Sequence, residues 1–516
     1  MHRRSFIEYA AGAAGAAAAV AAWRPVARPQ AFELDEATIA SLQEGMRSGR
    51  YTARSLCEAY LARIDAVDRA GPALRSVLET NPDALAIADR LDADRKARRS
   101  RGPLHGIPVL IKDNIATADR MMTTAGSLAL VGVTPPRDSV VAERLRAAGA
   151  VILGKTNLSE WANFRGNQSS SGWSGRGGQT KNPYALDRNP CGSSSGTGAA
   201  IAANLAAVGV GTETDGSIVC PSSACSLVGV KPTLGLIGGA GIIPIAHTQD
   251  TAGPMCRTVT DAAILLGVLT GKDYGASLDA NGLRGARIGV ARKKCFGYSP
   301  EADALVEAAI DVLRRQGAVI VDPADIPHLG EYDDSEFTVL LYEFKTDLNA
   351  YLAEWAPRAP IKTLADLIAF NETNKARELQ YFGQEILVQA QEKGPLTDQA
   401  YVDALAKDRR LSRAEGLDAV FAEHTLDAIV APTGSPAWPT DLVNGDHFLG
   451  ASSTPAAVAG YPSVSVPAGY AFGLPVGMSL IGRASSEATL LKLAYAYERA
   501  ANPRKAPRFL ATVDLS

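Results

Sequence analysis

Apolar residues occur along the chain in two alternating patterns, short uninterrupted runs and longer stretches with helical spacing. The runs 109–111 and 151–153 each predict a buried strand, and the stretch 138–148 between them, which Gly149 ends, predicts a helix. A strand, a helix and a second strand in this order form a crossover between parallel neighbours. The pattern therefore favours an α/β fold with a mainly parallel sheet.

Helix N-cap residues, and glycines that end helices, indicate further elements. Residues 36–48 and 52–68 predict two helices separated by Gly49, and Thr52 is a good N-cap for the second. A helix over 299–316 has a similar start, with serine as the N-cap and proline in the first turn. The remaining expected elements are helices over 199–207 and 487–500 and strands over 463–467 and 475–481.

Two segments do not follow this alternation of short strands and helices. Residues from about 334 to 424 are mostly amphipathic helix with few glycines, which predicts a helical insertion. At the N-terminus, Arg3 and Arg4 precede a run of Ala and Gly, a pattern that resembles a twin-arginine export signal. We therefore expect a signal peptide over 1–30, one domain over 31–516, and a periplasmic or secreted protein.

The charge balance excludes several classes of partner. The chain has 516 residues, with 52 Lys and Arg against 55 Asp and Glu, so its formal net charge is −3. Nucleic-acid and membrane-surface binding need clustered basic residues, which this balance does not suggest. With 46% hydrophobic and 21% charged residues, the chain has the composition of a globular protein. Beyond the N-terminal segment, no stretch is long and apolar enough to predict stable membrane insertion.

The six cysteines do not predict a disulfide framework, because that inference applies to short secreted chains. No pair has the Cys-x-x-Cys spacing, and Cys220 and Cys225 are too far apart for the usual close pair of structural zinc ligands. We therefore expect the cysteines to be small buried residues, and we expect no metal site.

Glycine and serine gather between 166 and 198, where single aromatic and charged residues argue for an ordered loop around a site rather than a linker. Within it, 192–196 fits the G-x-S-x-G pattern, which would make Ser194 the nucleophile of an α/β-hydrolase that uses a histidine. That pattern needs a strand directly before it, whereas 182–190 is rich in Pro, Asp and Asn and predicts a loop. A histidine triad is therefore disfavoured, although three downstream histidines keep it open, namely His247, His424 and His447.

A serine nucleophile can also be activated without imidazole. A hydroxyl needs a base within hydrogen-bond reach, and a lysine can serve only where burial favours its neutral amine. Lys112 directly follows the apolar run 109–111, at the expected end of a buried strand. The alternative is structural, with Lys112 in an ion pair with Asp113.

Six ordered segments resemble the amidase signature hydrolases, and the resemblance extends from about residue 37 to residue 502. The lysine segment comes first, the Gly- and Ser-rich signature follows, and the last match lies near the C-terminus. The matching segments are 106–114, 191–198, 211–218, 231–233, 250–255 and 473–477. The resemblance implies one α/β/α domain around a large mixed β-sheet, with the helical stretch covering the acyl pocket.

The resemblance also implies roles for individual residues. Ser217 becomes the acylated nucleophile, Ser193 the bridging serine in a loop with a cis peptide bond, and Lys112 the base. Backbone N–H groups of the segment that ends at Ser217 would bind the oxyanion. The expected oxyanion and substrate-binding residues are Thr214, Asp215, Gly216 and Ser194. Such a mechanism requires neither a metal nor an organic cofactor.

Details of the signature resemble the peptide amidase branch, which removes ammonia from C-terminal peptide amides. The segments 171–173, 176–180, 191–195 and 214–217 carry this likeness. Many family members have glycine where Asp215 stands and arginine where Val219 stands, so Asp215 is either a turn residue or a polar group near the leaving amide.

We therefore expect an exported amidase that acts on peptide amides. The alternatives are a general amidase for aliphatic or aryl amides and the A subunit of a tRNA-dependent amidotransferase. A catalytically silent binding protein is the interpretation from a different class. The sequence does not predict the oligomeric state.

Overall fold

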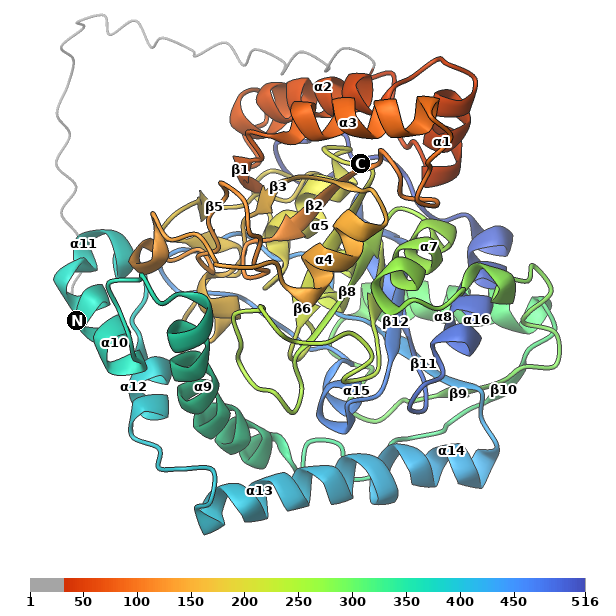
Figure 1. Ribbon diagram of the computed structural model, residues 1–516. Helices are drawn as coiled ribbons and strands as arrows, with labels where there is room; N and C mark the ends of the chain where they lie inside the picture. The colour runs from red at the N-terminus through yellow and green to blue at the C-terminus, as the bar shows by residue number, and fades with distance from the viewer. Residues whose placement is uncertain (1–31, 516) are drawn as a thin grey trace, which may run out of the picture. The chain divides into compact units, whose positions relative to one another are not determined.

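A mixed sheet of 11 strands forms the centre of the protein (Figure 1). The structure, a computed structural model, describes residues 32–515, so the expected signal peptide over 1–30 lies outside the described residues. In the order in which they lie in the sheet, the strands are β1 (Val77–Thr80), β3 (Val151–Thr156), β2 (Pro108–Lys112), β6 (Val208–Glu213), β8 (Thr251–Cys256), β7 (Val228–Lys231), β12 (Ser463–Ala471), β13 (Leu474–Ile481), β11 (Ala428–Pro432), β9 (Arg287–Val290) and β10 (Val319–Val321). A separate pair is formed by β4 (Trp173–Ser174) and β5 (Gly178–Gln179).

The large sheet has a parallel group of three strands on each side of an antiparallel centre, and β1 adds an antiparallel edge beside β3. β2 pairs in parallel with β3 and β6, and β9 pairs in parallel with β10 and β11. The other pairings in this sheet are antiparallel. The prediction of a mainly parallel sheet is therefore wrong, because the βαβ pattern over 109–153 reports only on its own strands. Every residue of β2, β3 and β6 is buried, and since successive side chains point to opposite faces, both faces are covered there.

Helices surround this sheet. The α-helices are α1 (Ile39–Arg47), α2 (Ala53–Arg63), α3 (Ala84–Lys96), α4 (Val140–Ala147), α5 (Ser195–Ala202), α6 (Val219–Ala224), α7 (Val259–Thr270), α8 (Pro300–Arg315), α9 (Asp333–Trp355), α10 (Leu364–Thr373), α11 (Lys375–Glu378), α12 (Glu385–Gln391), α13 (Gln399–Arg409), α14 (Asp418–His424), α15 (Thr454–Ala459) and α16 (Glu487–Ala501). The other helical segments are η1 (Ile64–Arg69), η2 (Leu128–Leu130), η3 (Glu160–Asn163), η4 (Gly275–Ser277) and η5 (Arg410–Leu417). None of the helices within residues 32–515 has the length and apolar character needed to span a membrane.

Local signals predicted several helix starts correctly. Thr52 caps α2 through a reciprocal hydrogen-bond pair, and Ser299 caps α8. The helix expected over 52–68 is present, although its second part, η1, is a π-helix. The α5 helix begins and ends earlier than expected, because the chain turns at Asn204, where φ is 59°, before it enters β6.

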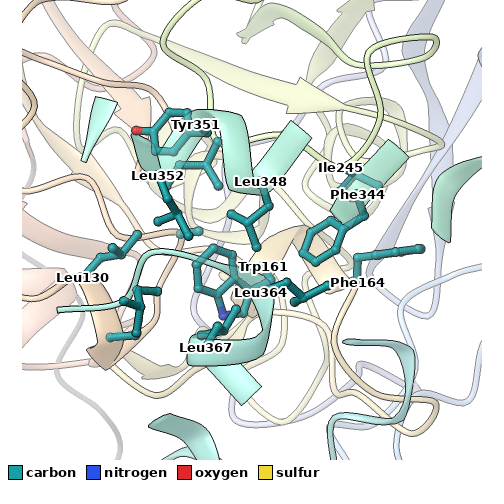
Figure 2. Packing of buried hydrophobic residues seen from close by; sticks show 14 of the residues in the cluster. Leu130, Trp161, Phe164, Ile245, Phe344, Leu348, Tyr351, Leu352, Leu364 and Leu367 are labelled. Carbon is teal, nitrogen blue, oxygen red and sulfur yellow. The ribbon is translucent and has the colours of Figure 1, made fainter. Parts of the chain in front are cut away.

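The helical stretch expected over 334–424 is present as α9 to α14, drawn in teal to light blue in Figure 1. Part of its apolar surface packs on segments outside the stretch. Phe344 and Leu348 of α9 and Leu364 of α10 belong to one buried cluster with Trp161, which follows β3 (Figure 2). This packing holds α9 beside the loops at the end of the sheet where the site lies.

Candidate active site

The carboxyl end of β2 carries Lys112 into a buried polar cluster. Lys112 Nζ lies 2.7 Å from Ser193 Oγ and 2.9 Å from Thr212 Oγ1, and it donates a hydrogen bond to Thr212 O at 3.2 Å. The Lys112 side chain is fully buried. Thr212 belongs to β6, the parallel neighbour of β2, so the sheet itself places the lysine beside the strand that leads to Ser217.

Burial lowers the pKa of Lys112 to about 7, although the carboxyl groups of Asp250 and Glu213 act in the opposite direction. Asp113 is not its partner, because the Asp113 carboxylate accepts a hydrogen bond from Arg176 Nη1 at 3.3 Å. The ion-pair alternative for Lys112 is therefore wrong. An amine with this pKa has a large neutral fraction near pH 7.

Two separate segments bring Ser193 and Ser217 to one cavity of about 530 Å³. The Ser194 N–H donates to Ser217 O at 3.2 Å, which joins the two segments. The peptide bond between Gly192 and Ser193 is cis, as the resemblance implies. Ser217 stands just before α6, and the N–H groups of Ile218 and Val219, at the N-cap and first position of α6, donate to Glu213 Oε2. The two serines thus come from different elements, and tertiary contacts alone bring them together.

The loop before α6 presents backbone donors at this cavity. Within the described residues, the N–H groups of Asp215, Gly216 and Ser217 have no protein acceptor. Gly216 has a φ of 77°, and a Cβ there would lie 3.1 Å from Ser453 Oγ, so the position favours glycine. Consecutive N–H groups without a protein acceptor are suited to bind an oxyanion.

Ser194 is not among the residues that line the cavity. Its side chain is fully buried, and its hydroxyl donates to Thr212 O at 3.0 Å and accepts from the Thr212 N–H at 3.2 Å. The Ser194 side chain therefore anchors the start of α5 to β6 instead of facing a substrate. No histidine within residues 32–515 lines the cavity, so the geometry gives the histidine triad no support.

The side chains of Thr214 and Asp215 connect the oxyanion loop to its surroundings. The Thr214 hydroxyl donates to Asp250 Oδ1 at 2.6 Å, and Thr454 Oγ1 donates to Asp215 Oδ2 at 2.7 Å. Burial raises the pKa of Asp215, and burial together with the Asp215 charge raises the pKa of Glu336 on α9. Asp215 therefore lines the cavity and joins this loop to α15 through Thr454.

The outer wall includes residues that the sequence did not single out. Trp438 and Phe448 come from the segment between β11 and α15, and their rings meet edge to face at 5.7 Å. Trp438 Nε1 donates to Asp446 Oδ1 at 3.1 Å, and Leu340 of α9 adds the contribution of the helical stretch. These residues lie in a segment rich in Gly and Pro that single aromatic and acidic residues interrupt. The segment 166–198 has the same character, so this composition could have indicated a second ordered loop around the site.

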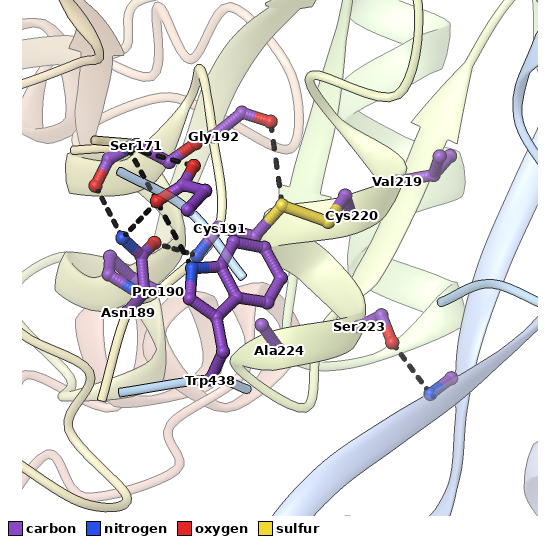
Figure 3. The surroundings of a disulfide bond; sticks show 12 residues. Ser171, Asn189, Pro190, Cys191, Gly192, Val219, Cys220, Ser223, Ala224 and Trp438 are labelled. Carbon is purple, nitrogen blue, oxygen red and sulfur yellow. Dashed lines mark hydrogen bonds between the residues drawn. A yellow bond between two sulfur atoms is a disulfide. The ribbon is translucent and has the colours of Figure 1, made fainter. Parts of the chain in front are cut away.

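Two cysteines are bonded to each other, which corrects the expectation that the cysteines are only small buried residues. Cys191 and Cys220 form a disulfide with Cα atoms 6.0 Å apart and a sequence separation of 29 (Figure 3). The four free thiols are buried as expected, namely Cys57, Cys225, Cys256 and Cys295. Sequence spacing did not reveal the pair, because the two cysteines meet only where the Ser193 segment packs against α6.

One group in the described chain has the spacing of metal ligands, namely His247, Glu343 and Asp347. Its acceptor atoms already have donors. His247 Nδ1 lies 2.8 Å from Asp347 Oδ2, and Tyr401 OH donates to Glu343 Oε1 at 2.7 Å. The group does not line the serine cavity.

Known proteins resemble the chain over almost its whole length. The Amidase family model matches residues 55–491. A probable amidase of Arabidopsis thaliana is 42% identical over 505 residues, which cover 93% of this chain and 93% of that protein. The crystal structure of native peptide amidase from Stenotrophomonas maltophilia is 51% identical, with a TM-score of 0.89, and the match covers 93% of this chain and 100% of that one.

An amidotransferase component is also similar. The A subunit of the glutamyl-tRNA(Gln) amidotransferase of Chloroflexus aurantiacus is 36% identical over 491 residues, which cover 90% of this chain and 97% of that protein. The family match includes the segments of Lys112, Ser193 and Ser217. The chain therefore belongs to the amidase family, and it is an amide-hydrolysing enzyme.

Proposed function

We propose that this amidase hydrolyses the C-terminal amides of peptides to the free acid and ammonia, through an acyl-enzyme on Ser217. The observation that carries the proposal is the 2.7 Å contact between buried Lys112 and Ser193, in a cavity that Ser217 also lines. A base, a relay hydroxyl and a nucleophile are the parts that serine acylation requires.

In the acylation step, neutral Lys112 accepts the proton of the Ser193 hydroxyl while Ser193 accepts the proton of Ser217. Ser217 Oγ attacks the amide carbonyl carbon, and the backbone N–H groups of Asp215 and Gly216 bind the oxyanion that forms. Lys112, now charged, returns a proton through Ser193 to the leaving nitrogen. The C–N bond then breaks and ammonia departs.

Deacylation uses the same residues with water as the nucleophile. Lys112 withdraws a proton from water through Ser193, the hydroxide attacks the ester carbon, and the proton returns to Ser217 Oγ as the acid leaves. The lowered pKa of Lys112 supports both steps, because an amine with a pKa of about 7 both accepts and returns a proton near neutral pH.

The cavity wall supports a peptide as the substrate. A cavity of about 530 Å³ is large enough to hold one end of an extended peptide, while the rest of the peptide lies outside it. Its polar wall includes the uncharged amides of Asn163, Gln168 and Asn444, which suit hydrogen bonds with peptide N–H and C=O groups. The likeness to peptide amidase at 51% identity supports the same substrate class.

Two alternatives use the same proposed triad. A general amidase would release ammonia from small aliphatic or aryl amides as well as from peptides. An amidotransferase component of the kind that the Chloroflexus relative represents would release ammonia from glutamine in the presence of its partner chains.

Ammonia release from a panel of amides tests the substrate. Peptide amides should exceed acetamide, benzamide, fatty amides and glutamine in kcat/KM. A preference for small amides, or activity on glutamine only, would replace the proposal by one of the alternatives.

A serine-directed fluorophosphonate tests the nucleophile. Wild type should be labelled on the peptide that contains Ser217, and Ser217→Ala should not be labelled. The matched control is Ser222→Ala on α6, which removes a buried hydroxyl that has no hydrogen-bond partner in the described part of the chain and should keep the labelling. Labelling that persists in Ser217→Ala, or that lies on Ser194, contradicts the assignment.

We also propose that residues 1–30 direct export by the twin-arginine route to the periplasm or the medium. The support is the Arg3-Arg4 pair before an Ala-rich run. Changing Arg3 and Arg4 to Lys should retain the protein in the cytoplasm, and unchanged export of this variant would point to another route.

A further inference from the structure

The disulfide lies between the two serine segments and borders the cavity. Cys191 stands two residues before Ser193, and Cys220 stands three residues after Ser217. Both cysteines line the cavity and are 5% and 8% exposed, whereas the four free cysteines are fully buried. A reductant that enters the cavity therefore reaches this disulfide more easily than it reaches any of the four free thiols.

Hydrogen bonds also hold the segment before Ser193 near α6, since Asn182 Nδ2 donates to Ala224 O at 2.9 Å and to Asn189 O at 3.3 Å. The Ser194 N–H donates to Ser217 O, and the Cys191 N–H donates to Asn189 Oδ1 at 2.8 Å. Cys191 has a φ of 58°, in the left-handed region that residues with side chains rarely adopt. The covalent bond therefore holds this residue in a conformation that its own backbone disfavours.

The same bond supports the aromatic wall of the cavity. Trp438 packs against the disulfide and Ala224 (Figure 3). Its Nε1 donates to Asp446 Oδ1, which also accepts from Asn189 Nδ2 at 3.0 Å. One network thus joins the disulfide, the segment before Ser193 and the wall on which a substrate rests.

We propose that the Cys191–Cys220 disulfide positions the catalytic serines and that its reduction lowers amidase activity while the fold persists. This inference rests on the proposed function of Ser193 and Ser217. Lys112 is fixed in β2 by the sheet, and Ser193 is held on its C-terminal side by the Ser194 anchor to β6 and by the Ser159 N–H, which donates to Ser193 O at 3.1 Å. The disulfide holds the N-terminal side of Ser193 through Cys191, so its loss lets Ser193 shift relative to its base from that side. A misplacement of about 1 Å can reduce an enzymatic rate about 100-fold.

The reduction needs a dithiol as the electron donor. Its thiolate attacks one sulfur and breaks the S–S bond, which releases one cysteine thiolate and forms a mixed disulfide. The second thiol of the reductant then displaces the other cysteine and closes a cyclic disulfide. Two electrons and two protons pass to Cys191 and Cys220, and the reductant leaves oxidised by two electrons.

The first experiment compares oxidised, dithiothreitol-reduced and reoxidised full-length protein in ammonia release from a peptide amide. Reduction should lower kcat at least about tenfold with a smaller change in KM, because the reacting groups and not the binding wall are displaced most. Circular dichroism should stay native, and reoxidation should restore kcat. Equal kcat in the two redox states overturns the proposal, and so does loss of the native spectrum on reduction.

Variants separate the disulfide from thiols in general. The double variant Cys191→Ala with Cys220→Ala should have the low kcat of the reduced enzyme and no response to dithiothreitol. Cys225→Ala, at the end of the same helix, is the matched control and should respond as wild type does. A double variant with wild-type kcat overturns the proposal.

Alkylation tests access from the cavity independently of turnover. After brief reduction, iodoacetamide should modify Cys191 and Cys220 and spare the four buried thiols, and a saturating peptide amide should slow this modification in Ser217→Ala. Modification at equal rates with and without the amide contradicts access through the cavity. If oxidised wild type releases ammonia from no amide, the proposed function fails, and the alkylation pattern still decides whether the bond borders the cavity.

Discussion

Two buried lysines lie on neighbouring strands, and only one of them contacts a serine that lines the cavity. Lys112 ends β2, and Lys155 lies on β3, where it pairs with Ile111 in the parallel register. Both side chains are fully buried, and burial lowers the pKa of Lys112 to about 7 and that of Lys155 to about 8. By burial and pKa alone, the two amines are nearly equivalent.

The difference lies in what each amine contacts. Lys112 reaches the Ser193 hydroxyl at the wall of the cavity, whereas Lys155 donates to Ile115 O at 2.6 Å and to Thr123 Oγ1 at 2.8 Å, and neither of these residues lines the cavity. A lowered lysine pKa therefore does not identify a base without a hydroxyl that connects it to a nucleophile. Lys155 supports the loop that follows β2.

Replacing the two lysines separately gives the largest expected contrast. Lys112→Met removes the proposed base, so kcat/KM for a peptide amide should fall about 10²- to 10⁴-fold. Lys155→Met should change kcat/KM far less, because its amine takes no part in proton transfer. Thermal unfolding of each variant checks that it is folded, and equal losses in two folded variants contradict the distinction.

The pH dependence of kcat/KM gives the next largest effect. Below pH 7, kcat/KM should fall about tenfold per unit, because only the neutral amine of Lys112 accepts a proton, and above pH 7 it should level off. Lys155→Met should keep the wild-type midpoint. A flat wild-type profile between about pH 6 and about pH 9 is incompatible with lysine as the base.

Asp250 is an acid near Lys112 and Asp113 is an acid near Lys155. Replacing each by its amide should shift the pH profile of kcat/KM only in the first case. The charge of Asp250 raises the pKa of Lys112, and that of Asp113 raises the pKa of Lys155. Asp250→Asn should therefore move the midpoint of kcat/KM to lower pH, by no more than about 0.5 unit, because burial raises the pKa of Asp250 itself to about 7 and its carboxyl is only partly charged at the midpoint. Asp113→Asn is the matched control and should leave the midpoint in place; a similar shift in both variants argues against a specific link to Lys112.

The smallest effect concerns stability. Because the pKa of Lys155 is about 8 in the folded protein and higher in the unfolded chain, the unfolded state binds more protons above pH 8, and this lysine adds stability as pH rises. The free energy of unfolding of wild type relative to Lys155→Met should thus increase between pH 8 and pH 10, by about 1 kcal/mol per unit. Urea unfolding at a series of pH values measures it, and a constant difference would mean that Lys155 is not neutralised on folding.

Elements with local signals were predictable. The apolar run before Lys112 forms a buried strand, and Thr52 and Ser299 cap the helices that follow them. Burial patterns and caps depend on neighbours within a few residues, so the chain carries them locally. The antiparallel centre of the sheet was not predictable in this way, since it depends on how distant strands pair.

The site shows the same division. The resemblance to amidase signature hydrolases located the segments of Lys112, Ser193 and Ser217, and the structure places the first two in contact and all three at one end of the sheet. It did not locate Trp438, which lies in a segment without a matching motif. It also placed Ser194 with the substrate-binding residues, whereas the Ser194 hydroxyl is bound to the backbone of β6.

The sequence by itself determined where the buried strands end, where several helices begin and which segments match the amidase family. Only the tertiary structure decided the partners. Lys112 contacts Ser193, 81 residues away, instead of Asp113 beside it, and Cys191 is bonded to Cys220 instead of remaining a free thiol. The physical reason is that secondary structure depends on interactions within a few residues, whereas a partner is chosen by the packing of distant segments, which no local pattern specifies.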